Sequence, residues 1–268
     1  QMCIRDSQYT GHVKAIVGGR GAKTTSLSLN RATASPKQPG SCFKVLSTYA
    51  PGLNECGMTL ATTIKDEPYR YASGQPVNNW DNKYIGSARV RYAIEHSMNV
   101  CAVRTLTETV GLEKGYKYLE NFGFTTLVNN DPNYPGMSDI AQATALGGIT
   151  RGVYNIEMTA AYAAIANSGI YTEPLLYTEI LDHDGNVLID NSKPITRRVL
   201  KESTAFLLTS AMQDVINRGT GTPARLNNMP AAGKTGTTEN STDLWLSAYT
   251  PYYTCSVSVS YTHLTLPT

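Results

Sequence analysis

The sequence predicts an α+β fold in which an antiparallel sheet is flanked by helices. Segments with the 3.6-residue periodicity of helices precede, separate and follow segments that read as antiparallel hairpins. This order distinguishes the chain from a doubly wound parallel sheet, in which strands and helices alternate one by one. With 268 residues, 41% of them hydrophobic, the chain is long enough to bury a core of its own.

The composition excludes several classes of protein. The chain has 23 basic and 21 acidic side chains, and only 16% of its residues are charged, against roughly 25% in typical soluble proteins. Because this balance provides no basic field for a phosphate backbone, we expect no nucleic acid partner. No stretch approaches the ~18 consecutive apolar residues of a membrane-spanning helix. The five cysteines include no C-x-x-C pair and have no histidine at metal-ligand spacing, which argues against a zinc site.

The pattern of residues 13–167 predicts one strand, several helices and a long irregular stretch. An apolar run at 13–17 predicts a strand that closes at a glycine pair. Pro39 breaks the chain, and 42–50 predicts a helix that stops at Pro51. The segment 54–82 is rich in glycine, proline, asparagine and tyrosine, which predicts long surface connections. Further helices are expected at 88–96, 100–110, 113–122, 139–146 and 156–167, the last with Asn155 as its N-cap.

The remainder predicts two hairpins and one more helix. The first hairpin is expected to have strands at 175–181 and 187–189, with an Asp-Gly pair at its turn. An amphipathic helix is expected at 202–217. Two strands follow at 231–238 and 244–250, joined by the polar turn 239–242.

The two ends of the chain differ in character from the segment between them. Residues 1–7 (QMCIRDS) and 256–268 (SVSVSYTHLTLPT) resemble translated cloning or sequencing-adapter sequence. We therefore predict non-native tails on either side of a domain at 8–255. The alternative for the C-terminal end is a genuine last strand, because 253–261 has strand-like composition.

Ser41 and Lys44 form an S-x-x-K motif where the first helix begins. Residues three apart share a helix face, so the amine of Lys44 can reach the hydroxyl of Ser41 as a base reaches its nucleophile. Free backbone N–H groups and the helix dipole would stabilise an oxyanion beside this serine. Alone the motif is weak, because an N-cap serine followed by a surface lysine has the same pattern.

Ser97 and Asn99 flank Met98 between two predicted helices. In an extended loop, residues i and i+2 point to the same side, where a hydroxyl and an amide could relay a proton and hold a substrate carbonyl. The alternative is an ordinary interhelical turn in which Asn99 caps the second helix.

Lys234, Thr235, Gly236 and Thr237 belong to a GKTGTT segment. A phosphate loop of the form G-x-x-x-x-G-K-[ST] would need glycine where Asn228 stands, and no apolar strand precedes the segment, so the nucleotide interpretation fails. As a strand, the segment offers a cation flanked by hydroxyls, which suits a carboxylate. It also offers a bare backbone at Gly236, which a substrate can approach closely.

Together these motifs stand in the order that is the signature of penicillin-binding proteins and class A β-lactamases. Over about residues 10–254 the chain resembles the transpeptidase domain of a bifunctional, class A penicillin-binding protein. The resemblance implies the serine β-lactamase and penicillin-binding transpeptidase fold. The segments that carry it are 30–33 (NRAT), 38–44 (QPGSCFK), 76–79 (PVNN), 97–99 (SMN), 218–222 (RGTGT) and 233–238 (GKTGTT).

Two departures separate the chain from the β-lactamases. Met98 fits the variable position of S-x-N in penicillin-binding proteins, whereas class A β-lactamases usually have aspartate there. No E-x-x-L-N segment, which supplies their deacylating glutamate, lies between the second and third motifs. Slow deacylation by water favours a transpeptidase.

The resemblance implies a serine D,D-transpeptidase that cross-links peptidoglycan stem peptides and is acylated by β-lactam antibiotics. Ser41 would attack the penultimate D-alanyl carbonyl of the stem peptide and give its proton to a neutral Lys44. Ser97 would relay the proton to the leaving amine, and Asn99 would hold the substrate amide. The terminal carboxylate would be bound by Lys234, Thr235 and Thr237, beside Gly236. The resemblance implies no metal or organic cofactor.

Three alternatives use the same fold: a D,D-carboxypeptidase, a β-lactamase and a non-catalytic β-lactam sensor domain. The resemblance also implies that the full-length protein works on the extracytoplasmic face of the bacterial cytoplasmic membrane. We expect that protein to carry a membrane anchor and a glycosyltransferase domain outside the present sequence. We also expect the C-terminal part of the domain to be truncated.

Overall fold

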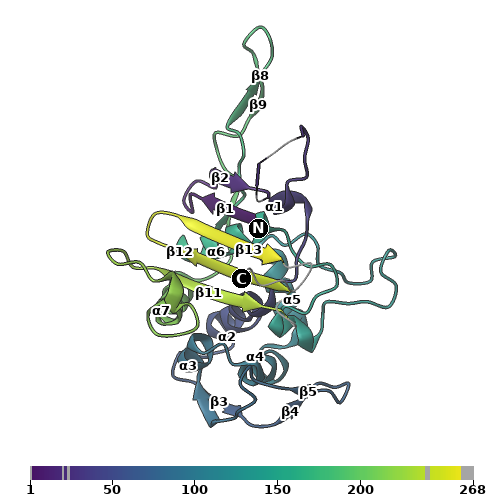
Figure 1. The fold of residues 1–268 in the computed structure, drawn as a ribbon, viewed down its shortest axis with the longest axis vertical. Helices are drawn as coiled ribbons and strands as arrows, with labels where there is room; N and C mark the ends of the chain where they lie inside the picture. Colours follow the sequence, from purple (N-terminus) through teal and green to yellow (C-terminus); the bar gives the residue numbers. More distant parts are fainter. Residues whose placement is uncertain (1, 20, 23–24, 239–241, 261–268) are drawn as a thin grey trace.

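A five-stranded antiparallel sheet forms the centre of the computed structural model, which describes residues 2–19, 21–22, 25–238 and 242–260. The strand order is β11, β12, β13, β1, β2 (Figure 1). The strands are β1 (Met2–Asp6), β2 (Val13–Val17), β11 (Ala232–Thr237), β12 (Asp243–Tyr249) and β13 (Thr254–Ser260). Because β12 and β13 alternate buried and half-buried residues, the sheet presents one face to the core.

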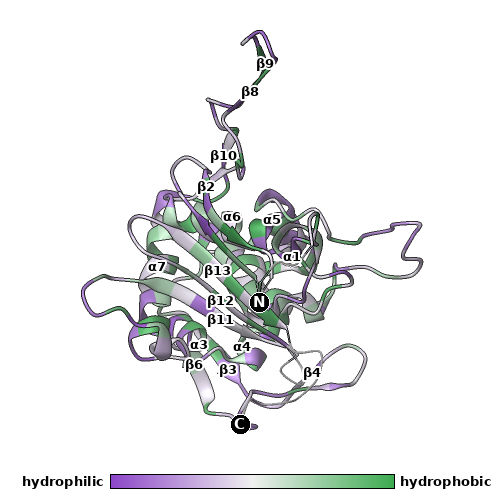
Figure 2. Ribbon diagram, turned by 45° about the horizontal axis from the view of Figure 1, so that its top comes forward, coloured by the Kyte–Doolittle hydropathy of each residue, from purple (hydrophilic) through white to green (hydrophobic). Residues whose placement is uncertain are grey.

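Two long helices cover that face. α6 (Asn155–Ala166) packs on β1, β12 and β13, while α7 (Glu202–Asn217) packs on β11 and contacts α6. Figure 2 shows α6 as a largely hydrophobic helix behind the sheet. Ten of its residues are buried, and its many alanines let it lie close to the strands.

A mostly helical part adjoins the β11 edge of the sheet (Figure 1, lower half). Its helices are α2 (Ala50–Glu55), α3 (Val90–Glu95), α4 (Asn99–Thr105) and α5 (Leu112–Asn121). Shorter helical segments are α1 (Arg31–Ala34), the 3-10 turns Gly40–Cys42, Gln142–Leu146 and Thr222–Ala224, and the π-helical turns Lys44–Tyr49 and Leu106–Val110. One hydrophobic core, including Phe43, Met158 and Trp245, joins this part to the sheet.

Four strand pairs lie outside the central sheet. β3 (Thr63–Asp66) pairs with β6 (Gly86–Arg89), β4 (Tyr69–Arg70) with β5 (Pro76–Val77), β7 (Ile170–Thr172) with β10 (Thr196–Arg198), and β8 (Glu179–Leu181) with β9 (Val187–Asp190). The β8–β9 hairpin extends away from the body of the domain (Figure 1).

Several predicted boundaries were wrong for local physical reasons. The helix after Ser41 continues through Pro51 to the end of α2, because proline near the start of a new helical segment forfeits no hydrogen bond. The predicted helix 139–146 is reduced to its last turn, because the Asp139 side chain accepts backbone N–H groups from Val128 and Thr150 instead. Tyr154, not Asn155, occupies the N-cap of α6.

Both chain ends take part in the sheet. β1 pairs with β13 from Met2 opposite Ser258 to Asp6 opposite Thr254. The C-terminal segment thus forms the strand that its composition predicts. The non-native origin of 1–7 and 256–268 stays a prediction, and 261–268 lie outside the described residues, as do 239–241 of the predicted polar turn.

Candidate active site

Ser41 lies in a tight turn that is fixed from two sides. The turn precedes the helical run that carries Lys44 and contacts β11 and β12. The carbonyl of Gln38 accepts a hydrogen bond of 2.8 Å from Nε1 of Trp245. The side chain of Gln38 donates to the carbonyl of Ile149 and accepts from its N–H at 3.1 Å. The backbone before the serine is therefore held in one position.

Two glycines allow β11 to approach this turn closely. Gly40 has φ of +54°, and a Cβ there would lie 2.9 Å from the carbonyl oxygen of Thr237. A Cβ on Gly236 would lie 2.5 Å from the carbonyl oxygen of Pro39 and 3.0 Å from Sγ of Cys42. The glycine of the K-T-G motif is thus required by packing against the serine turn, a reason that the sequence did not reveal.

Lys44 is completely buried, and its amine meets three oxygens. Nζ donates to the carbonyl of Ser97 at 2.6 Å and to Oδ1 of Asn99 at 2.5 Å, and it lies 3.2 Å from Oγ of Ser97. Burial, and then the charge of Lys234, hold the pKa of Lys44 well below its usual range. The environment therefore favours a neutral amine.

Lys234 reaches the same serine from β11. It is also completely buried, and its Nζ donates to Oγ of Ser97 at 2.8 Å and to the carbonyl of Thr235 at 3.0 Å. Burial lowers the pKa of Lys234 to about 8. The Ser97 hydroxyl is therefore in contact with both amines.

The backbone between α3 and α4 brings Ser97 and Asn99 to these amines. Ser97 has φ of +55°, in the left-handed region that a serine seldom adopts. The side chain of Asn99, the first residue of α4, donates from Nδ2 to the carbonyl of Asn78 at 2.7 Å. Because a carbonyl can only accept, this contact identifies Oδ1 as the atom that faces Lys44.

Ser41 lines two adjoining cavities. They have volumes of about 520 and 890 Å³ and share Ser41, Asn99, Thr237 and Thr238 in their walls. The Ser41 hydroxyl makes no hydrogen bond to any residue in the described part of the chain. The Lys44 amine lies against Ser97 and Asn99, so the S-x-x-K pair forms no direct hydrogen bond here.

Thr235 and Thr237 line the larger cavity, and Thr235 is tied to a neighbouring turn. Its Oγ1 lies 2.7 Å from Oγ1 of Thr220. Thr237 is exposed at the boundary of the two cavities. The structure thus brings all eight predicted residues to one cleft or its buried wall: Ser41, Lys44, Ser97, Asn99, Lys234, Thr235, Gly236 and Thr237.

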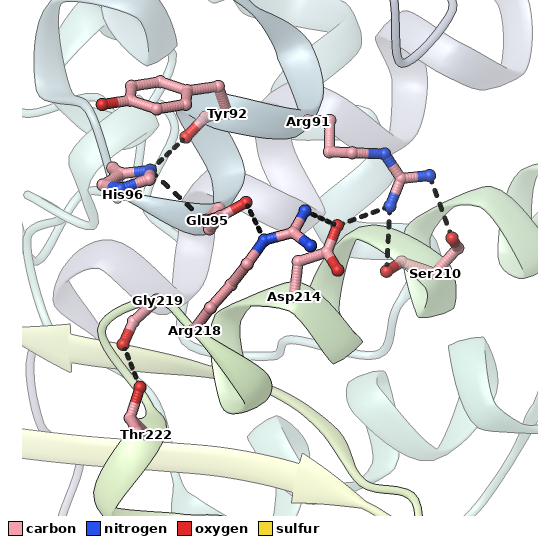
Figure 3. Close-up of polar contacts among 9 residues, drawn as sticks. All are labelled: Arg91, Tyr92, Glu95, His96, Ser210, Asp214, Arg218, Gly219 and Thr222. Carbon is pink, nitrogen blue, oxygen red and sulfur yellow. Dashed lines mark hydrogen bonds and ion pairs between the residues drawn. The ribbon is translucent and has the colours of Figure 1, made fainter.

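An ion-pair network lies beside the turn from Gly219 to Thr222 (Figure 3). Arg218 donates from Nε to Glu95 at 3.1 Å and lies 3.0 Å from the carboxylate of Asp214. Arg91 pairs with the same oxygen of Asp214 at 2.7 Å. The network joins the end of α3, just before Ser97, to the end of α7.

Two further polar residues behind the cleft were not singled out by the sequence. Asn79 accepts hydrogen bonds from the first N–H groups of α4, and Asp66 accepts one from Asn79. Asn79 was part of a recognised motif but had no assigned role, while Asp66 carried no local signal. Among the described residues, no group of three or more acidic, histidine or cysteine side chains could hold a metal ion.

Comparison with known sequences relates the chain to one family. Residues 7–265 match the family described as "Penicillin binding protein transpeptidase domain". Penicillin-binding protein 1A of Clostridium acetobutylicum is 39% identical over 263 residues, which cover 94% of this chain and 31% of that protein. Penicillin-binding protein 1F of Bacillus subtilis is 35% identical over 258 residues, covering 94% of this chain and 34% of that protein. The chain spans about a third of the length of these relatives.

Comparison with solved structures shows the same fold. The PonA1 protein of Mycobacterium tuberculosis in complex with penicillin V has a TM-score of 0.82 at 24% identity, covering 97% of this chain and 68% of that chain. Penicillin-Binding Protein 1A from Haemophilus influenzae has a TM-score of 0.81 at 25% identity, covering 97% of this chain and 43% of that chain. The predicted α+β transpeptidase fold is therefore confirmed.

Proposed function

The chain belongs to the penicillin-binding protein transpeptidase family and resembles its class A members, and we propose that it is a serine D,D-transpeptidase domain. It would cross-link peptidoglycan stem peptides through an acyl-enzyme intermediate, and β-lactams would acylate the same serine. The proposal assigns the nucleophile to Ser41, which lines both cavities.

The observation that carries the proposal is the set of contacts around the Lys44 amine. The Ser97 carbonyl and Oδ1 of Asn99 accept hydrogen bonds only, so they take up two N–H groups. A neutral amine then has its lone pair left for a hydroxyl. Because burial and Lys234 keep the pKa of Lys44 well below its usual range, this amine is available as a general base.

The proposed reaction begins when Ser41 Oγ bonds to the penultimate D-alanyl carbonyl carbon. The serine proton passes to Lys44, and the tetrahedral oxyanion accepts hydrogen bonds from the backbone N–H groups of Ser41 and Thr237. The bond to the terminal D-alanine then breaks, and its nitrogen takes a proton through the Ser97 hydroxyl. That hydroxyl contacts both amines, which supports its role as a relay.

Binding of the substrate is assigned to the residues around the larger cavity. Lys234, with Thr235 and Thr237, would hold the terminal carboxylate, since a cation beside hydroxyls suits that group. Asn99, which lines both cavities, would hold the substrate amide. Gly236 would contribute indirectly, by letting β11 pack against the serine turn so that the peptide can lie along the strand edge.

We also propose where the full-length protein acts. Its substrate is assembled outside the cytoplasm, which supports the extracytoplasmic face of the bacterial cytoplasmic membrane as its site. In the part of the chain that the structure describes, no helix is long and apolar enough to cross a membrane.

Covalent labelling with a fluorescent penicillin tests the proposal. We expect the folded chain to be labelled and Ser41→Ala to lose all labelling, while Ser87→Ala, an exposed serine on β6, keeps it. A folded parent chain that is never labelled would disprove the assignment.

A second assay separates the transpeptidase from its alternatives. A donor peptide ending in D-Ala-D-Ala is supplied with and without an amine acceptor, and the products are identified by mass spectrometry. A transpeptidase forms the cross-linked product, a carboxypeptidase only releases D-alanine, and a sensor domain is acylated without turnover. Rapid hydrolysis of the penicillin would identify a β-lactamase.

A further inference from the structure

We propose that Asn79, oriented by the buried carboxylate of Asp66, is a positioning residue for acylation of Ser41. The inference rests on the proposed function and extends it to two side chains outside the three motifs. Asn79 would act by fixing the Ser97 turn and the Asn99 amide, so that the Asn99 oxygen meets the Lys44 amine.

Asn79 replaces a cap that α4 does not possess. Met98 occupies the N-cap position and has no side-chain oxygen for the first N–H groups of the helix. Oδ1 of Asn79 accepts from the N–H of Asn99 at 2.9 Å and from the N–H of Val100 at 3.2 Å. The start of α4 is thus determined by a residue twenty positions earlier in the chain.

The neighbouring backbone determines which way the Asn99 amide faces. Nδ2 of Asn99 donates to the Asn78 carbonyl at 2.7 Å, so Oδ1 is left for Nζ of Lys44 at 2.5 Å. Asn79 therefore holds the backbone of Asn99, and the neighbouring Asn78 holds its side chain. Displacement of this segment would move or rotate the amide beside the base.

Asp66 in turn determines the orientation of Asn79. Asp66 is fully buried on β3, and no basic side chain pairs with it in the described ranges. Its two oxygens accept from Nδ2 of Asn79 and from the N–H of Ile85, both at 2.8 Å. Nδ2 of Asn79 also donates to the carbonyl of Lys83 at 2.9 Å. With Nδ2 engaged in this way, the oxygen of Asn79 must face α4.

The consequence for the base can be measured. The charged and titratable groups around Lys44 are Lys234 on β11, Cys42 in the serine turn and Cys101 on α4. The Asn99 oxygen adds an acceptor that stabilises the ammonium form. Loss of this acceptor would lower the pKa of Lys44, so the amine would be neutral at lower pH and the acid limb of the acylation profile would move to lower pH.

The experiment compares Asn79→Ala and Asp66→Asn with the parent chain, using the second-order rate constant of penicillin acylation per folded molecule from pH 5 to 9. We expect the plateau to fall by about 10- to 100-fold, because the base is misplaced. We expect the acid limb to move down by about one pH unit. NMR titration of the Lys44 side chain reports the same shift without requiring acylation.

Two control variants measure the effect of structural damage alone. Glu157→Gln removes another buried carboxylate that accepts hydrogen bonds from Thr125 and Tyr154, far from the cleft. Asn54→Ala removes a side chain that bonds Tyr118 and the backbone of residue 201. Both are expected to lose stability and to keep the parent pH profile.

The exchanged variant Asp66→Asn with Asn79→Asp tests the same contact with a polar side chain kept at both positions, which guards against loss of folding in the single variants. It restores a donor at 66 and acceptor oxygens at 79 for the first N–H groups of α4, while the Lys83 carbonyl loses its donor. We therefore expect its acylation rate to lie between that of Asn79→Ala and that of the parent. Single variants that behave like the controls, or a folded exchange variant that remains as slow as Asn79→Ala, would overturn the inference. A parent that is never acylated refutes the proposed function instead, while an unchanged Lys44 titration in Asn79→Ala refutes this inference independently.

Discussion

Lys44 and Lys234 direct their amines at the same oxygen, the Ser97 hydroxyl, at 3.2 and 2.8 Å. Both side chains are completely buried, so the low dielectric strengthens the repulsion between two ammonium ions. The pKa of Lys44 is held well below its usual range, and that of Lys234 is lowered to about 8. Both amines therefore lose a proton more easily than an exposed lysine, and for Lys44 the charge of Lys234 adds to the effect of burial.

The variant Lys234→Gln is expected to raise the pKa of Lys44. Its positive charge is the second cause of the low pKa of Lys44 after burial, so its removal makes protonation of Lys44 easier. The base would then stay protonated to higher pH, and the acid limb of the acylation profile would move to higher pH. Rate constants from pH 5 to 9 check this, with Lys117→Gln on α5 as an exposed control. If the acid limb of the Lys234→Gln profile lies at the same pH as that of the parent, the two amines do not interact.

The contact between the serine turn and β11 can be tested with a pair of glycines. Gly40 and Gly57 both have positive φ, at +54° and +69°, so alanine at either costs roughly 1–2 kcal/mol of backbone strain. Only at Gly40 would the new methyl meet backbone, that of Thr237. We expect Gly40→Ala to lose about 1–3 kcal/mol more than Gly57→Ala in chemical denaturation, and to acylate more slowly. Equal losses would contradict the close packing.

The motif residues could be predicted from the sequence because each carries its chemistry in a short segment. Ser41 and Lys44 lie three residues apart, and Lys234 and Thr235 are adjacent. The order of these motifs along the chain then indicates the family. The helix 202–217 was likewise predicted with its observed bounds, because a long amphipathic pattern is local information.

The supporting contacts could not be predicted because they join distant segments. Asp66 and Asn79 are separated by thirteen residues and a strand pair, and Arg218 meets Glu95 across more than a hundred residues. No periodicity or motif in the sequence indicates that either pair is in contact. The pairing of the two chain ends in the sheet is of the same kind, since strand neighbours depend on the whole fold.

The Glu95–Arg218 ion pair is expected to stabilise the turn that carries Thr220. Glu95 is largely buried while Arg218 is mostly exposed, so a double-mutant cycle should give a coupling of about 0.5–1 kcal/mol, reduced by salt. The exposed Lys117–Glu120 pair on α5 serves as the comparison, with an expected coupling of about 0.3 kcal/mol. A Glu95–Arg218 coupling no larger than this would mean that the network does not support the turn.

The cysteine beside the nucleophile is expected to be inert in the folded protein. Cys42 is completely buried, its Sγ contacts the carbonyl of Lys234, and burial raises its pKa to about 11. Cys101 is also buried, and burial raises its pKa to about 12. Because the thiolate is the reactive form, both should resist iodoacetamide at pH 8.

Cys56 provides the internal comparison, because it is half-buried. Its Sγ lies 3.8 Å from the Lys114 amine, at the edge of α2. Peptide mass spectrometry should find Cys56 alkylated in the native protein, and Cys42 and Cys101 alkylated only after unfolding in urea. Alkylation of native Cys42 at a rate near that of Cys56 would show that the serine turn opens, and would make the thiol a candidate for control of the site.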